Sequence, residues 1–157
     1  MKLIVLSGPI GVGKTSFRDS LVRMFGAQKV STREWILEHT SCANERGALQ
    51  AAGDELDRKT GGGWVADAVQ AIMPVAGNAI LLLDAARVKS QVDAMKQRFG
   101  DAVFHVHLSA ADEVLERRYA GRKAELKEYP TYLEAKRNGT EAQVSTLAKA
   151  ADLVLDT

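Results

Sequence analysis

The sequence predicts an α/β fold, a three-layer αβα sandwich around a five-stranded parallel sheet. Short runs of almost only apolar residues recur along the chain, and stretches with apolar residues at helical spacing separate them. Strands that are apolar throughout are typical of parallel sheets covered by helices on both faces. The length of 157 residues suits a single domain. The predicted strands are Lys2–Ser7, a short segment around Val30, Ala79–Leu83, Ala102–Leu108 and Leu153–Leu155.

Between these strands, apolar positions recur at the spacing of a helical face. The predicted helices are 13–25, 33–39, 44–59, 64–73, 89–99, one that opens near 112 and one that opens near 140. Ser109–Asp112 and Thr140–Gln143 match the capping-box pattern, so we expect them to open the last two helices. Residues 121–139 are polar and basic, and Gly121, Pro130 and Gly139 interrupt them.

Composition and charge disfavour several classes of protein. Apolar residues make up 46% and charged residues 26% of the chain, as in ordinary globular domains. Lys and Arg number 21 against 20 Asp and Glu, which disfavours a protein that binds nucleic acid mainly through phosphates. The one cysteine, Cys42, excludes an internal disulfide, and no signal peptide or membrane-spanning stretch is evident, so we expect a cytoplasmic protein. The chain ends directly after its last predicted strand, which would also suit one domain of a longer protein.

A glycine-rich loop joins the first predicted strand to the first predicted helix. Gly8–Thr15 matches the pattern G-x-x-x-x-G-K-[ST] of a P-loop, in which backbone N–H groups and a helix N-terminus hold a phosphate chain. We expect Lys14 to act catalytically at the β- and γ-phosphates of ATP, and Thr15 to bind Mg²⁺. The alternative is an ordinary glycine turn. The expected nucleotide-binding residues are Gly8, Ile10, Gly11, Val12, Gly13, Lys14, Thr15 and Ser16.

Asp84 follows the third predicted strand, at the edge of a parallel sheet where ligands collect. We expect its carboxylate to serve catalysis by holding Mg²⁺ or orienting an acceptor, and Arg87 to contact an acceptor phosphate. The alternative is that Asp84 only opens a loop and Arg87 lies on a helix surface. Because Ala85 follows Asp84, the acidic pair of motor ATPases is missing. The chain also lacks the Asn-Lys-x-Asp sequence of GTPases, so a small kinase remains.

Basic residues gather after the fourth predicted strand, at Arg117, Arg118, Arg122 and Lys123. Arginines that close over a phosphoryl group stabilise the charge that develops during its transfer. Arg118 and Arg122 are four residues apart, so a continuous helix would place both on one face, and we expect both to be catalytic. The alternative is a solvated basic surface.

Polar residues between the second and third predicted strands indicate an acceptor pocket. Arg46 and Gln50 would share one face of helix 44–59, and Arg33 follows the second strand. We therefore expect Arg33, Arg46, Gln50 and Arg87 to bind the substrate. The alternative for the helix is a stripe that faces solvent.

With the P-loop, the Asp84 and Arg87 pair and the basic cluster in place, the chain resembles the nucleoside monophosphate kinase group of P-loop kinases. The segment Arg46–Val65, with its Leu-Gln pair, Gly53 and Trp-Val pair, is similar to phage-type deoxynucleoside monophosphate kinases. The resemblance implies a P-loop NTPase fold of the nucleotide-kinase type, with ATP and Mg²⁺ as cofactors.

The resemblance also implies how the chain is organised. One kinase domain would span residues 1–157, with an acceptor-binding region at about 31–74 and a lid at about 117–128. Arg46, Gln50 and Arg87 would face the acceptor nucleotide. Arg118 and Arg122 would bridge the donor and acceptor phosphates.

Three functions are compatible with these features. The first is transfer of the ATP γ-phosphate to a (deoxy)nucleoside monophosphate, a small-molecule partner. The second is a kinase for a hydroxyl acceptor, such as a nucleoside, a small metabolite or a modified base in DNA, with Asp84 or Glu34 as the base. The third is a nucleotide-binding accessory domain with little turnover. Nucleic acid enters only as an acceptor, no membrane is involved, and the sequence leaves the oligomeric state open, a homodimer included.

Overall fold

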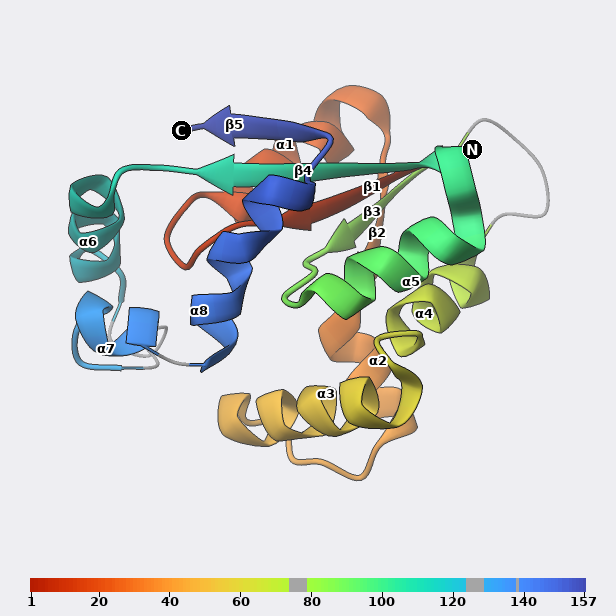
Figure 1. Ribbon diagram of the computed structural model, residues 1–157, viewed down its shortest axis with the longest axis horizontal. Helices are drawn as coiled ribbons and strands as arrows, with labels where there is room; N and C mark the ends of the chain where they lie inside the picture. The colour runs from red at the N-terminus through yellow and green to blue at the C-terminus, as the bar shows by residue number, and fades with distance from the viewer. Residues whose placement is uncertain (74–78, 124–128, 138) are drawn as a thin grey trace.

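A computed structural model describes residues 1–73, 79–123, 129–137 and 139–157 (Figure 1). Its centre is a sheet of five parallel strands in the order β2-β3-β1-β4-β5. This confirms the predicted α/β sandwich with a five-stranded parallel sheet. The strands are β1 (Lys2–Ser7), β2 (Gln28–Ser31), β3 (Ile80–Asp84), β4 (Val103–Ser109) and β5 (Leu153–Asp156).

Helices cover both faces of this sheet. Apolar residues of α2, α4, α5 and η3 pack with one face, and the partly buried stripe of α3 packs against them. Apolar residues of α1, α6 and α7 pack with the other face. The helices are α1 (Lys14–Phe25), α2 (Thr32–His39), α3 (Arg46–Thr60), α4 (Trp64–Ile72), α5 (Lys89–Phe99), α6 (Asp112–Ala120), α7 (Tyr132–Arg137) and α8 (Gly139–Val144), with short 3-10 turns η1 (Gly100–Ala102) and η3 (Ser145–Ala150).

The inner strands are apolar on both faces because both faces are covered. Leu81 and Leu83 of β3 belong to the core on the α4 and α5 side, whereas Leu82 belongs to the core on the α1 side. All three side chains have no exposed surface. Burial on both faces explains why the sequence signal of this strand is a continuous run rather than an alternation.

The two predicted capping boxes are wrong. Ser109 is the last residue of β4, and α6 begins at Asp112 after Ala111, whose side chain cannot cap. Thr140 lies inside α8, which begins at Gly139. The Ser109 hydroxyl contacts the edge strand β5, donating to the Leu155 carbonyl at 3.5 Å. The Ser109 hydroxyl therefore bonds to a neighbouring strand and not, as the local pattern predicts, to the start of a helix.

The polar and basic stretch 121–139 contains a helix that the sequence analysis missed, α7. Tyr132 and Ala135 of α7 are buried against the α1 side of the sheet. The Tyr119 hydroxyl of α6 donates to the Tyr129 carbonyl at 2.7 Å and fixes the chain before α7. One short amphipathic turn of helix gives too weak a periodicity to be seen in sequence.

No helix in the described part of the chain combines the length and apolar character that a membrane crossing requires.

The carboxyl ends of β4 and β5 lie on the side of the molecule where α6 and α7 are found (Figure 1). The candidate site lies at this edge of the sheet, where the P-loop leaves β1 and Asp84 ends β3.

Candidate active site

The P-loop, the next turn of α1 and four other segments line a cavity of about 510 Å³, the P-loop pocket. The residues of Gly8–Thr15 that line it are Gly8, Ile10, Gly11, Gly13, Lys14 and Thr15. Seven cations and two carboxylates among the described residues also line it, and these are Lys14, Arg18, Lys29, Arg33, Arg87, Arg118, Arg122, Asp84 and Glu141. So strong a local excess of positive charge, in a chain of net charge +1, suits a polyanionic ligand.

Lys14 opens α1, and its ammonium group turns back onto the loop. Nζ donates to the Gly8 carbonyl at 2.5 Å and to the Pro9 carbonyl at 2.9 Å. Burial lowers the pKa of Lys14 to about 8, although the nearby Glu141 carboxylate opposes that shift. Lys14 is therefore a cation near neutral pH, held where the loop would receive phosphates.

Two of the predicted nucleotide-binding residues do not line the pocket with their side chains. Val12 is buried at 1% exposure, and its carbonyl accepts from the Thr157 hydroxyl at 3.0 Å. Ser16 is exposed on α1 and lies outside the residues that line the pocket. Thr15 is exposed toward the pocket, where its hydroxyl is available as an oxygen ligand.

Asp84 reaches the P-loop pocket from the end of β3, together with an arginine that the sequence analysis missed. Arg18 Nη1 donates to Asp84 Oδ2 at 2.7 Å, and the two side chains are only 19% and 16% exposed. Arg18 is one helical turn after Lys14 in α1, so both lie on the same face. That spacing is the signal that could have identified Arg18. The role of Asp84 in metal binding and catalysis stays a prediction.

Arg118 and Arg122 both line the P-loop pocket, but one helix does not present them together. Because α6 ends at Ala120, Arg122 lies beyond the helix, and the predicted helical face is wrong. Arg118 Nη1 donates to the Thr157 hydroxyl at 3.0 Å. Of the predicted lid, residues 124–128 lie outside the described residues.

The pocket offers suitable partners for ATP and Mg²⁺. Nη1 of Arg122 is buried and has no hydrogen-bond partner among the described residues, so a bound anion would satisfy it. Mg²⁺ is commonly held by one or two carboxylates together with substrate phosphates. The Thr15 hydroxyl and the Asp84 carboxylate supply oxygen ligands of that kind beside the phosphate cradle.

Glu141 is a second residue that the sequence analysis missed. It comes from α8, and its Oε2 accepts from the backbone N–H of Ile10 at 3.0 Å, although 131 positions separate the two residues. The neighbouring Thr140 hydroxyl accepts from Gln50 Nε2 at 3.0 Å. The helix α8 thus contacts the P-loop through Glu141 and α3 through Thr140. Nothing in the local sequence around Glu141 could reveal a contact over that distance.

A second cavity of about 510 Å³, the α3 pocket, adjoins the P-loop pocket. The predicted substrate residues Arg33, Gln50 and Arg87 all line it, and Arg33 and Arg87 also line the P-loop pocket. Arg33 Nη2 donates to Asn44 Oδ1 at 2.6 Å. The side chain of the fourth predicted residue, Arg46, lies outside the described part of the structure.

A buried polar network closes the wall of the α3 pocket. Asp57 of α3 accepts from Trp64 Nε1 of α4 and from Gln91 Nε2 of α5. Burial raises the pKa of Asp57, although its hydrogen bonds with Gln91 and Trp64 oppose that shift. The sequence analysis missed this network because its members come from three helices.

Solved structures of other proteins share this fold. A gluconokinase from Sinorhizobium meliloti 1021 matches with a TM-score of 0.61 at 16% identity, over 99% of this chain and 81% of that chain. A sugar kinase from Janibacter sp. HTCC2649 matches with a TM-score of 0.55 at 16% identity, over 99% of this chain and 85% of that chain. A shikimate kinase from Bacteroides thetaiotaomicron matches with a TM-score of 0.52 at 14% identity, over 99% of this chain and 86% of that chain. At such identities, these likenesses show the fold alone.

Comparison of the sequence with curated proteins gave no match. A family model does match, and its description is that of an AAA domain. The match covers residues 4–143, which include the P-loop, Asp84, both predicted catalytic arginines and Glu141. Because the match extends over most of the sequence, the chain belongs to the AAA domain family AAA_18.

Proposed function

We propose that the chain is an ATP-dependent kinase whose acceptor is a (deoxy)nucleoside monophosphate. The observation that carries this proposal is the junction of the two pockets. Arg33 and Arg87 line both cavities, so an acceptor phosphate between them would lie beside the phosphates of a nucleotide in the P-loop. The α3 pocket, at about 510 Å³, has room for the rest of a small acceptor.

The fold supports the kinase part of the proposal. The three similar structures are named as a gluconokinase, a sugar kinase and a shikimate kinase, and this chain aligns with each over 99% of its length. The matched family model spans the P-loop and the arginines that follow β4. These likenesses support phosphoryl transfer and name no acceptor for this chain.

The charges in the P-loop pocket favour an acceptor that is already anionic. Its two carboxylates among the described residues both have partners, since Asp84 pairs with Arg18 and Glu141 accepts from Ile10. A phosphate acceptor needs no general base, because its oxygen is ionised at neutral pH. The bond between the γ-phosphorus and the β–γ bridging oxygen would break as the acceptor oxygen forms its own bond to phosphorus, and ADP would leave. Lys14 and Arg122 would stabilise the charge on the transferred group, and bound Mg²⁺ would neutralise the β- and γ-phosphates.

A hydroxyl acceptor is the second candidate, and the acidic wall of the α3 pocket favours it. Asp54 and Asp57 both line this cavity, and carboxylates commonly bind hydroxyl groups. The similar structures include enzymes named for gluconate, a sugar and shikimate. A hydroxyl must lose its proton, so this chemistry requires one carboxylate to act as a base.

A panel of acceptors with γ-labelled ATP tests the proposal. Nucleoside and deoxynucleoside monophosphates, the matching nucleosides, gluconate and shikimate are each incubated with the protein. We expect label only in nucleoside diphosphates. Label only in compounds that began without a phosphate would overturn the nucleotide acceptor and favour the hydroxyl kinase. Tight ATP binding without transfer to any acceptor would favour an accessory domain.

We expect ATP affinity to fall as the pH rises above about 8, because burial lowers the pKa of Lys14 to about 8. Below that pH the free protein carries the positive charge that attracts phosphate, and above it the amine is neutral. Each further pH unit should weaken binding by up to about tenfold. Calorimetric titration from about pH 7 to about pH 10 measures this effect, with Lys14→Ala as the control that should lack it. An unchanged dissociation constant for the natural protein would contradict the prediction.

We expect Glu141→Gln to bind ATP about five- to tenfold more tightly, because it removes a negative charge that repels phosphates beside the Ile10 N–H. Glu134→Gln is the matched control, since it removes the same charge from an exposed position on α7 that contacts Thr131. Binding is measured with Mg²⁺ and again with a chelator. Weaker binding by the Glu141 variant in Mg²⁺ alone would contradict the prediction and would make Glu141 a helper of the metal.

A further inference from the structure

We propose that Asp57 and Gln91 are positioning residues that set the place of Arg87 through a chain of hydrogen bonds with a fixed direction. This inference rests on the proposed function to the extent that Arg87 is taken to bind the acceptor. The chain crosses three helices and a loop. Asp57 is on α3, Trp64 opens α4, Gln91 is in the first turn of α5, and Arg87 lies between β3 and α5.

Each link of the chain is short. The backbone N–H of Arg87 donates to Gln91 Oε1 at 2.9 Å. Gln91 Nε2 donates to Asp57 Oδ2 at 2.9 Å and to Oδ1 at 3.0 Å. Trp64 Nε1 donates to Asp57 Oδ1 at 2.6 Å. Gln91 and Trp64 are 4% and 3% exposed, so water cannot readily replace these partners.

The two donors at the ends of this hydrogen-bond chain fix its direction. The Arg87 amide and the Trp64 indole N–H can only donate, so both direct a hydrogen toward the residues between them. Gln91 satisfies Arg87 only with its oxygen, which leaves its amide nitrogen to donate to Asp57. Asp57 must then accept from both sides, and an ionised carboxylate can do so because both of its oxygens only accept hydrogen bonds. An asparagine at position 57 would place an N–H against one of the two donors.

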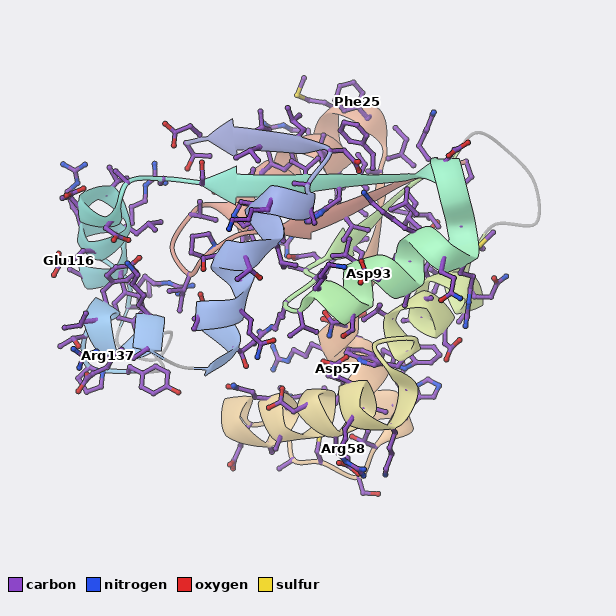
Figure 2. The ribbon with its side chains drawn as sticks, viewed as in Figure 1. Phe25, Asp57, Arg58, Asp93, Glu116 and Arg137 are labelled. Carbon is purple, nitrogen blue, oxygen red and sulfur yellow. The ribbon has the colours of Figure 1, made fainter. Side chains whose placement is uncertain are left out.

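Close packing holds the helices at this junction. Gly62, between α3 and α4, has a φ of +83°, and a Cβ atom there would lie 2.6 Å from the backbone nitrogen of Gln91. The turn after α3 therefore rests directly on the start of α5. Figure 2 shows Asp57 on the side of α3 that faces α4 and α5, whereas Arg58 lies on the opposite side. Arg58 is exposed and pairs with Glu55 instead.

The consequence of this arrangement concerns the acceptor. Arg87 borders both pockets, so a shift of its backbone would move the guanidinium away from an acceptor phosphate. The P-loop has its own anchors, since Lys14 bonds to the Gly8 and Pro9 carbonyls. Substitutions that break the hydrogen bonds between Arg87, Gln91 and Asp57 should therefore raise the KM for the acceptor and leave the KM for ATP unchanged.

Two single substitutions and their combination test the direction of the chain. We expect Asp57→Asn and Gln91→Glu each to raise the acceptor KM about tenfold, because each opposes two donors or two acceptors. In the double variant, the new amide at position 57 donates to the new carboxylate at position 91, which still accepts from Arg87. The acceptor KM should then return to within about twofold of the natural value. Asp93→Asn is the matched control, since it removes the same charge from an exposed pair with Lys89.

Hydrogen exchange at the Arg87 amide gives a readout that needs no acceptor. We expect protection in the natural protein, faster exchange in each single variant and recovery in the double variant. A double variant no better than the single variants, in KM or in exchange, overturns the inference even if a single variant fails to fold. A lower melting temperature with an unchanged acceptor KM would mean a merely structural role. If the natural protein phosphorylates no acceptor but the exchange pattern holds, the proposed function fails and the positioning of Arg87 stands.

Discussion

Lys14→Ala is expected to lower the rate of phosphoryl transfer by at least about 10²- to 10³-fold at saturating ATP. The ammonium group is the cation that the P-loop itself supplies, and it lies against the Gly8 and Pro9 carbonyls within the cradle. The substitution removes this charge at the position where charge develops during transfer. The measurement is kcat for the best acceptor from the panel.

Two controls separate chemistry from folding in this experiment. The melting temperature should change little, because Lys14 is held in the free protein at the cost of burying its charge, which lowers its pKa to about 8. Lys149→Ala removes the same charge from an exposed position on η3 that does not line the P-loop pocket, so it should leave kcat unchanged. A Lys14→Ala variant that keeps a near-natural rate at saturating ATP would refute the kinase assignment.

The features that sequence could predict are those that depend on near neighbours in the chain. The run at β3 is apolar because both faces of the strand are buried. An unbroken apolar run in the sequence therefore identifies it as an inner strand. The P-loop is contained within Gly8–Thr15, and its strand and helix adjoin it directly. The sheet, most of the helices and the phosphate cradle were therefore predictable.

The features that sequence could not predict depend on contacts between distant segments. Glu141 meets Ile10 across 131 positions, and Gln91 meets Asp57 across 34. The four-residue spacing of Arg118 and Arg122 would give a shared helical face only if α6 continued past Ala120, yet the fold brings both to the P-loop pocket. Hydroxyl and carboxylate groups bond to whichever partners the fold places beside them, including residues far away in the sequence. For this reason the local capping patterns also failed at Ser109 and Thr140.

Gly8→Ala is expected to lower the free energy of unfolding by about 3 kcal/mol and to weaken ATP binding at least tenfold. Gly8 has a φ of +144°, and a Cβ atom there would lie only 2.6 Å from the carbonyl oxygen of Leu108 on the neighbouring strand β4. The backbone of β4 cannot readily yield there, because Leu108 pairs with Leu155 of β5 and the preceding His107 pairs with Ser7 of β1. The start of the P-loop would therefore have to move, and the loop carbonyls that hold Lys14 would move with it.

Gly26→Ala distinguishes this clash from the cost of a positive φ. Gly26 ends α1 with a φ of +63°, and a Cβ atom there would meet nothing within 4 Å. Its substitution should therefore cost only the intrinsic strain of the left-handed conformation, about 1 kcal/mol, with ATP binding unchanged. Urea unfolding and calorimetric titration measure the two quantities for both variants. Equal losses of stability, or natural ATP affinity in the Gly8 variant, would show that close contact with β4 does not hold the cradle. A larger loss confined to Gly8 would show that the close contact between Gly8 and Leu108 of β4 fixes the start of the nucleotide site.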